Sequence, residues 1–107
     1  MNAPSDLEIK FHQRMLQIHE QAKTECGYNA TRFLNMVTDQ GGLQAAKALL
    51  SSSGYSEGLT RLWEEKRLDI SMEATILQEP WRSLFTSEEL SIARKKLAAL
   101  GYKADAL

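Results

Sequence analysis

The chain has 107 residues, which is enough for one hydrophobic core and therefore for one domain. Its 13 Lys and Arg residues nearly balance 14 Asp and Glu residues, so a formal net charge of -1 gives no overall attraction to nucleic acid or to an anionic membrane. Cys26 is the single cysteine, which excludes an internal disulfide and is typical of a reducing compartment. The sequence shows neither a leader-like segment nor a long apolar run, so we expect a cytoplasmic protein.

The first predicted helix begins at a capping box formed by Ser5 and Glu8 and ends near Gly27. Apolar residues recur along it at steps of three and four, which places them on one face. They are Leu7, Phe11, Met15, Ile18 and Ala22. At 100° per residue, Ile9 and Leu16 fall on the opposite side. We expect this second apolar strip to be covered by the C-terminal helices of the same chain or by another chain.

Two short helices follow and are predicted to meet at a pair of glycines. Asn29 is expected to cap the first, and Gly41 with Gly42 to end it. The inner face of this helix is predicted to contain Ala30, Phe33, Leu34 and Val37. The next helix is predicted from Leu43 to about Leu50, where alanines allow a neighbouring helix to approach closely. The serine-rich residues 51–55 are predicted to form a loop.

The C-terminal half contains further residues that predict where helices begin and end. In chain order they are caps at Ser56 and at Asp69 or Ser71, a helix end near Arg67, a first-turn proline at Pro80, a second capping box at Thr86 and Glu89, and a stop at Gly101. No segment shows the alternation that is typical of a strand. The sequence therefore predicts an all-α fold, a compact bundle of six to seven mostly short helices in a single domain, residues 1–107, with residues 1–4 flexible.

Candidate catalytic and metal-binding side chains are poorly spaced for either task. His12, His19 and Cys26 recur every seven residues, which is a rise of about 10.5 Å, too far for one ion to join them. Asp69 and Glu73 are at a facing distance on a helix, but no third ligand accompanies them. We therefore predict no catalytic residue, no metal site and no cofactor, and expect the protein not to be an enzyme.

Two stretches are candidates for nucleic-acid binding. Residues 29–50 have the length of a helix-turn-helix, but the second helix would offer only Gln44 and Lys47 to DNA. The last helix carries three consecutive basic residues: Arg94, Lys95 and Lys96. They are interpreted either as a solvated helix face or as the contact of an accessory nucleic-acid-binding module.

Several segments together resemble a small, largely uncharacterised bacterial helical domain, found alone or appended to restriction or HNH-type nuclease-like proteins. The segments are FHQRML at 11–16, CGYNATRFL at 26–34, GGLQAAK at 41–47, LWE at 62–64, RLD at 67–69, WRSLF at 81–85 and EEL at 88–90. The resemblance implies a helical domain and no catalytic residues. It points to Tyr28, Asn29, Arg32, Trp63 and Asp69 as the first positions to examine.

The leading hypothesis is a small non-catalytic helical interaction module that binds a protein partner or itself. The residues predicted to take part are Ile9, Leu16, Trp63 and Trp81, because Trp is enriched at interfaces and the two aliphatic residues form the second strip of the first helix. The two tryptophans are alternatively interpreted as core residues. The second hypothesis is an accessory nucleic-acid-binding module of a bacterial nuclease or defence system, acting through the basic triplet.

Overall fold

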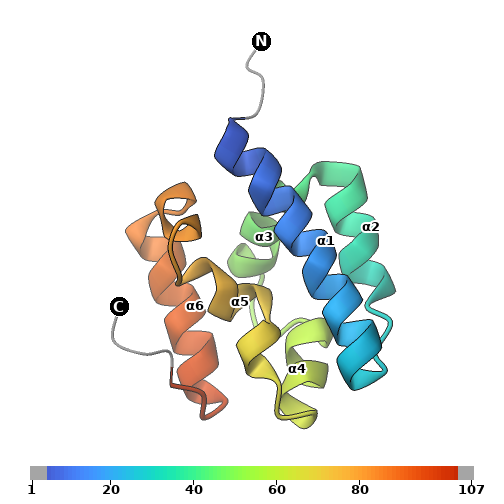
Figure 1. The fold of residues 1–107 in the computed structure, drawn as a ribbon. Helices are drawn as coiled ribbons and strands as arrows, with labels where there is room; N and C mark the ends of the chain where they lie inside the picture. Colours follow the sequence, from blue (N-terminus) through green and yellow to red (C-terminus); the bar gives the residue numbers. More distant parts are fainter. Residues whose placement is uncertain (1–4, 104–107) are drawn as a thin grey trace.

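A computed structural model describes residues 5–103, and within them the fold is all-α, as predicted (Figure 1). The elements are α1 (Asp6–Cys26), α2 (Thr31–Gln40), α3 (Gly42–Ser51), α4 (Glu57–Glu64), the 3-10 turn η1 (Leu68–Ile70), α5 (Met72–Ile76), the 3-10 turn η2 (Trp81–Leu84) and α6 (Ser87–Ala99). Residues 1–4, for which the sequence predicts flexibility, lie outside the described part of the chain. The buried apolar side chains of the described residues form one cluster.

Helix α1 begins as predicted and lies across α2 and α3 (Figure 1). Ser5 Oγ accepts a hydrogen bond from the backbone N–H of Glu8 at 3.1 Å and caps the first turn. The predicted inner stripe is confirmed, because Phe11, Met15 and Ile18 are buried and Ala22 extends the stripe to the last turn. This stripe is the surface on which the shorter helices pack.

Helices α1 and α3 approach each other closely where α3 begins. The backbone N–H of Gly42 donates a hydrogen bond to His12 Nδ1 at 2.9 Å, so a side chain of α1 satisfies one of the free N–H groups of α3. A Cβ atom at Gly42 would lie 2.7 Å from the Cα atom of His12. Only glycine therefore allows α3 to sit this close to α1.

Three details of the sequence prediction are wrong. Asn29 does not cap α2, which has Ala30 at its cap position and no side-chain cap; instead Asn29 Oδ1 lies 3.0 Å from His19 Nε2. Helix α4 ends at Glu64 rather than near Arg67, because Lys66 adopts a left-handed conformation with φ of 60°. Pro80, predicted in the first turn of a short helix, is instead the cap residue of a 3-10 turn.

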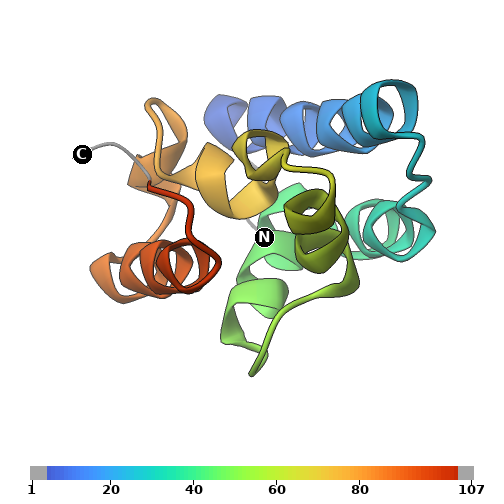
Figure 2. The same ribbon diagram turned by 90° about the horizontal axis from the view of Figure 1, so that it is seen from below.

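Helix α5 lies in the middle of the molecule, with α1 on one side and α6 on another (Figure 2). Ser71 caps it by accepting from the N–H of Ala74 at 3.1 Å, and all five of its residues are buried. Helix α6 opens with the predicted capping box of Thr86 and Glu89. Lys47 of α3 binds Glu89 at 2.7 Å and so ties the two helices together.

The two glycines that lie inside the first turn of a helix offer a matched test of the contact between α1 and α3. We expect Gly42→Ala to lower the free energy of unfolding by about 1–3 kcal/mol, because the backbone of α1 must move. Gly58→Ala in α4 should instead raise it by about 0.5 kcal/mol, since its added Cβ meets no atom within 4 Å. Urea unfolding of both variants measures the difference, and equal effects would contradict the close contact.

Candidate binding groove

The four side chains predicted to bind a partner do not form one surface. Ile9 and Trp63 are exposed, by 48% and 47%, whereas Leu16 and Trp81 are half-buried and pack against the core. The ring of Trp81 lies 5.6 Å from that of Phe11. Ile9 belongs to the start of α1 and Trp63 to the end of α4, at opposite ends of the molecule (Figure 1). Each of the two exposed residues therefore belongs to a separate surface.

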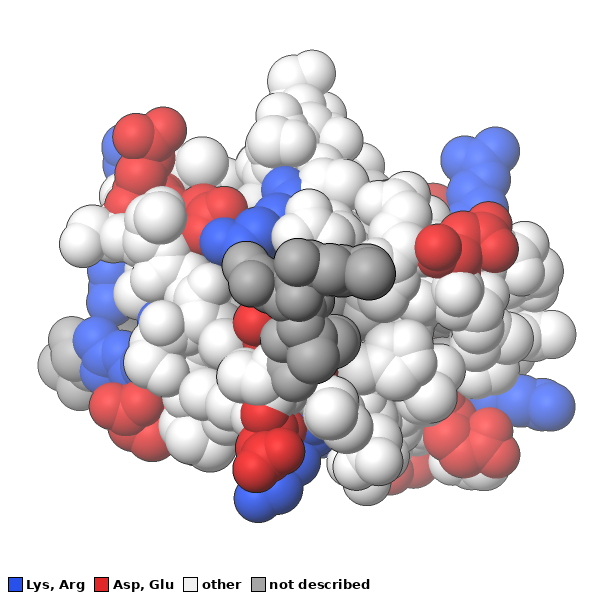
Figure 3. Space-filling model, turned by 90° about the horizontal axis from the view of Figure 1, so that it is seen from above, with Lys and Arg blue, Asp and Glu red and all other residues white. Residues whose placement is uncertain are grey.

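The basic triplet of α6 does not present three cations to solvent. Lys96 Nζ donates hydrogen bonds to the backbone carbonyls of Leu49 and Ser52, at 3.2 and 3.1 Å, and so satisfies the end of α3. Arg94 is half-buried, and Lys95 is the exposed member of the three. On the face drawn in Figure 3, basic side chains are mixed with acidic ones and do not gather into a patch.

The predicted reading helix of a helix-turn-helix, α3, is built into the core. Ala45 and Ala46 are fully buried, and the ammonium group of Lys47 is bound to Glu89 and lies 5.1 Å from the centre of the Phe85 ring. A helix in this position cannot enter the major groove of DNA without leaving the fold.

The remaining candidates from the sequence have separate surroundings. His12 accepts the N–H of Gly42, and burial raises the pKa of the Cys26 thiol, which disfavours the reactive thiolate. Asp69 is exposed and paired with Arg67 at 3.0 Å. Within residues 5–103, no three His, Cys, Asp or Glu side chains are placed to hold a metal ion.

A groove of about 220 Å³ runs between α2, the connection from α3 to α4, and the first turn of α4. We call it the outer groove. Its apolar and aromatic lining comes from Tyr28, Phe33, Met36, Leu49 and Tyr55. Its charged lining residues are Arg32 and Glu57, and serines and Gly58 complete the wall. Tyr55 is 47% exposed, which leaves much of its surface free for a ligand.

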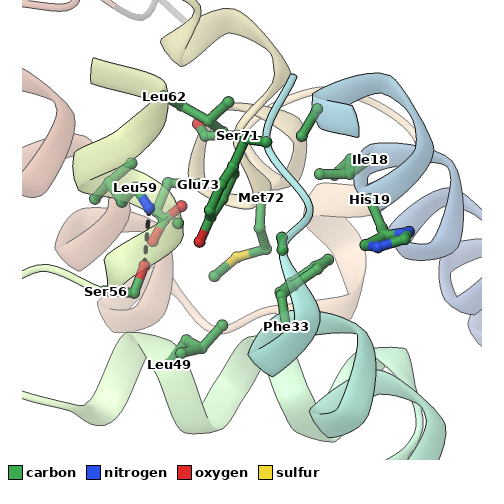
Figure 4. A pocket seen from close by; sticks show the side chains of 14 residues that line it. Ile18, His19, Phe33, Leu49, Ser56, Leu59, Leu62, Ser71, Met72 and Glu73 are labelled. Carbon is green, nitrogen blue, oxygen red and sulfur yellow. Dashed lines mark hydrogen bonds between the residues drawn. The ribbon is translucent and has the colours of Figure 1, made fainter. Parts of the chain in front are cut away.

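The outer groove adjoins a second hollow, which we call the inner cavity, of about 40 Å³. The two share five lining residues: Tyr28, Phe33, Leu49, Ser56 and Gly58. Figure 4 shows Glu73, Ser56 and Leu59 on one side of the inner cavity and Phe33 with His19 on the other. Its lining is predominantly apolar, so a polar group in it is conspicuous.

Glu73 is that group, a carboxyl from α5 that is only 3% exposed. Burial raises its pKa above the ordinary value, and its own backbone N–H and the charge of Lys96 oppose this only in part. In the described part of the chain, Glu73 forms no ion pair and its side chain makes no hydrogen bond with another residue. The free protein therefore has, beside this hollow, a carboxyl whose pKa is raised by burial.

The other polar side chains of the inner cavity already have partners. His19 meets Asn29, and the Tyr28 hydroxyl donates to Glu57 Oε1 at 3.3 Å. The two serines serve as helix caps: Ser56 accepts from Leu59 N, and Ser71 accepts from Ala74 N while donating to the carbonyl of Leu68. Burial and the neighbouring Glu57 raise the pKa of Tyr28, which keeps its phenol protonated as a donor.

No protein-family model, no curated protein and no solved structure matches this chain. The likeness to a bacterial helical domain thus stays a prediction; of the positions it indicates, Tyr28 and Arg32 line the outer groove. Among the described helices, none is long and apolar enough to cross a membrane. The sequence did not single out Glu73 as a lone buried carboxyl, because the acid is recognisable only from the elements that surround it.

Substitution of Glu73 tests the state of this carboxyl through the pH dependence of stability. The native pKa is raised above the value of about 4.5, so above that pH the native state binds more protons than the unfolded chain. The free energy of unfolding should therefore fall as the pH rises through the raised pKa. Glu73→Gln removes this loss, so we expect the variant to gain stability over the wild type as pH increases.

The measurement is urea unfolding between pH 4 and pH 8 for Glu73→Gln, with Glu64→Gln on the exposed side of α4 as the control. The stability difference from the wild type should grow with pH for the first variant and stay nearly constant for the second. A constant difference for both would show that Glu73 is not a buried acid.

Proposed function

We propose that this chain is a small non-catalytic helical interaction module that binds a protein partner in the outer groove. The observation that carries the proposal is the cluster of aromatic and Met side chains around this hollow, with Tyr55 half exposed above it. Tyr, Phe and Met are enriched in the centres of protein interfaces, and residues there carry most of the binding energy.

The size of the hollow supports a protein segment over a cofactor. Sites for drug-sized ligands occupy about 300–1,000 Å³, whereas the outer groove and the inner cavity measure about 220 and 40 Å³. Such spaces suit one or two side chains of a partner.

The nucleic-acid alternative has less support from the structure. It depends on Arg94, Lys95 and Lys96, of which Lys96 is engaged with the end of α3. The self-association expected from Ile9 and Leu16 is likewise less favoured, because Leu16 packs against the core of its own chain.

Two charge substitutions separate the outer groove from the surface of α1. Tagged wild type, Tyr55→Glu and Ile9→Glu would be used to capture partners from the lysate of the protein's own cells after nuclease treatment. Both sites are about half exposed, so neither variant should unfold. We expect the wild type and Ile9→Glu to retain one protein near stoichiometric amounts, and Tyr55→Glu to retain at least tenfold less.

The opposite pattern would place the interface on α1 and contradict the groove. Capture that disappears on nuclease treatment would favour the nucleic-acid module. Sedimentation velocity of the same three proteins tests self-association: a dimer lost only in Ile9→Glu would mean that the chain binds itself through α1.

A further inference from the structure

The inner cavity combines three features that together describe a ligand. It shares five lining residues with the outer groove, it is lined mostly by apolar side chains, and its one polar side chain without a partner residue in the described chain is a buried carboxyl. An acid in such a place is costly to ionise unless a positive group comes to it.

No basic side chain of the described residues supplies that positive group by contact. Lys96, whose charge acts on Glu73 from α6, is bound to the carbonyls of Leu49 and Ser52. The guanidinium of Arg61 lies over the Tyr28 ring, 5.2 Å from its centre, and is paired with Glu65. A positive group in contact with the Glu73 carboxyl would therefore have to come from a ligand.

From this arrangement we propose that the inner cavity binds the ammonium end of a lysine side chain of the protein partner, with Glu73 as its carboxylate. The inference rests on the proposed function, since the same partner would occupy the outer groove that adjoins the cavity. A lysine fits the chemistry because its apolar stem suits the walls and its ammonium group carries three hydrogen-bond donors.

The volume of the cavity sets the size of the group that enters. A space of about 40 Å³ holds roughly three water molecules. The last carbons and the nitrogen of a lysine side chain are about that large, whereas an aromatic ring or a bulky cofactor exceeds the space. Phe33 and Leu49, which line both hollows, would contact the stem of the lysine on its way in.

Binding in this way moves a proton. Burial raises the pKa of Glu73 in the free protein. When the ammonium group enters, the two charges pair, the pKa falls, and the proton held by the carboxyl is released to solvent. The other titratable or charged groups around the two hollows are His19 on α1, Tyr28 before α2, Arg32 on α2, Glu57 and Arg61 on α4 and Lys96 on α6. If a Glu73 variant no longer releases a proton on binding, the proton released by the wild type comes from the Glu73 carboxyl and not from one of these groups.

Three small probes of equal length test the cavity itself on the wild-type protein: n-butylammonium, n-butanol and butyrate. Amide NMR shifts at Glu73, Leu59 and Phe33 report binding. We expect saturable shifts with n-butylammonium, at least tenfold weaker binding of n-butanol, and none of butyrate. Calorimetry with n-butylammonium in phosphate and in Tris should give different enthalpies, because a proton is released to the buffer. Equal binding of the first two probes, or no difference between buffers, would overturn the proposal.

Glu73→Gln keeps the shape of the side chain and removes its charge. It should weaken n-butylammonium binding at least tenfold, leave that of n-butanol unchanged and abolish proton release. In the partner capture, Tyr55→Glu could lose the partner while Glu73→Gln retains it fully. That result would contradict the proposed lysine contact with Glu73 but would support partner binding in the outer groove. Retention of the partner in both variants would instead contradict binding in the outer groove. The experiment therefore distinguishes a failure of the proposed function from a failure of the lysine inference.

Discussion

Helix α5 is five residues long and has no exposed face, so every neighbouring element must pack against it. Such a helix is too short to be stable alone, and its stability comes from packing. It is held at its start by the Ser71 cap and surrounded by α1, α4 and α6. Because all its side chains point into protein, its one acidic residue, Glu73, is only 3% exposed. The arrangement that keeps the core closed therefore also creates the buried acid.

A buried carboxyl lowers stability whenever it is ionised, and a well-packed apolar residue of similar size would avoid that cost. The surrounding lining does not compensate it, since the nearby serines, His19 and Tyr28 already have partners. The space next to Glu73 adjoins a groove lined by aromatic residues. A partner that brings its own cation offsets the cost of ionisation, and this links an unfavourable feature of the free fold to the proposed binding.

Local signals in the sequence predicted much of the fold. The caps at Ser5, Ser56 and Thr86 depend on a few consecutive residues, and each forms as expected. The cap at Asn29 fails because a residue ten positions earlier, His19, takes its side chain. Glu73 was missed for a related reason: the spacing of Met72 and Ile76 predicts one buried face, whereas tertiary contacts bury the helix all round.

The aromatic residues also show the difference between what local sequence predicts and what depends on tertiary contacts. The sequence does not distinguish Trp63 from Trp81. In the structure Trp81 is half-buried and packs against Phe11, whereas Trp63 is exposed. Tyr55 has no periodicity to mark it, because it lies in the connection between α3 and α4. Binding residues on a connection become visible only when the flanking helices are in place.

The most direct measurement of the central claim is the titration of the Glu73 side-chain carboxyl carbon by NMR, without and with saturating n-butylammonium. In the free protein this carbon should titrate above the ordinary range of glutamate, and the pKa should fall when the ammonium ion is bound. A carbon that titrates in the ordinary range in both samples would show that Glu73 is neither a buried acid nor the partner of a cation.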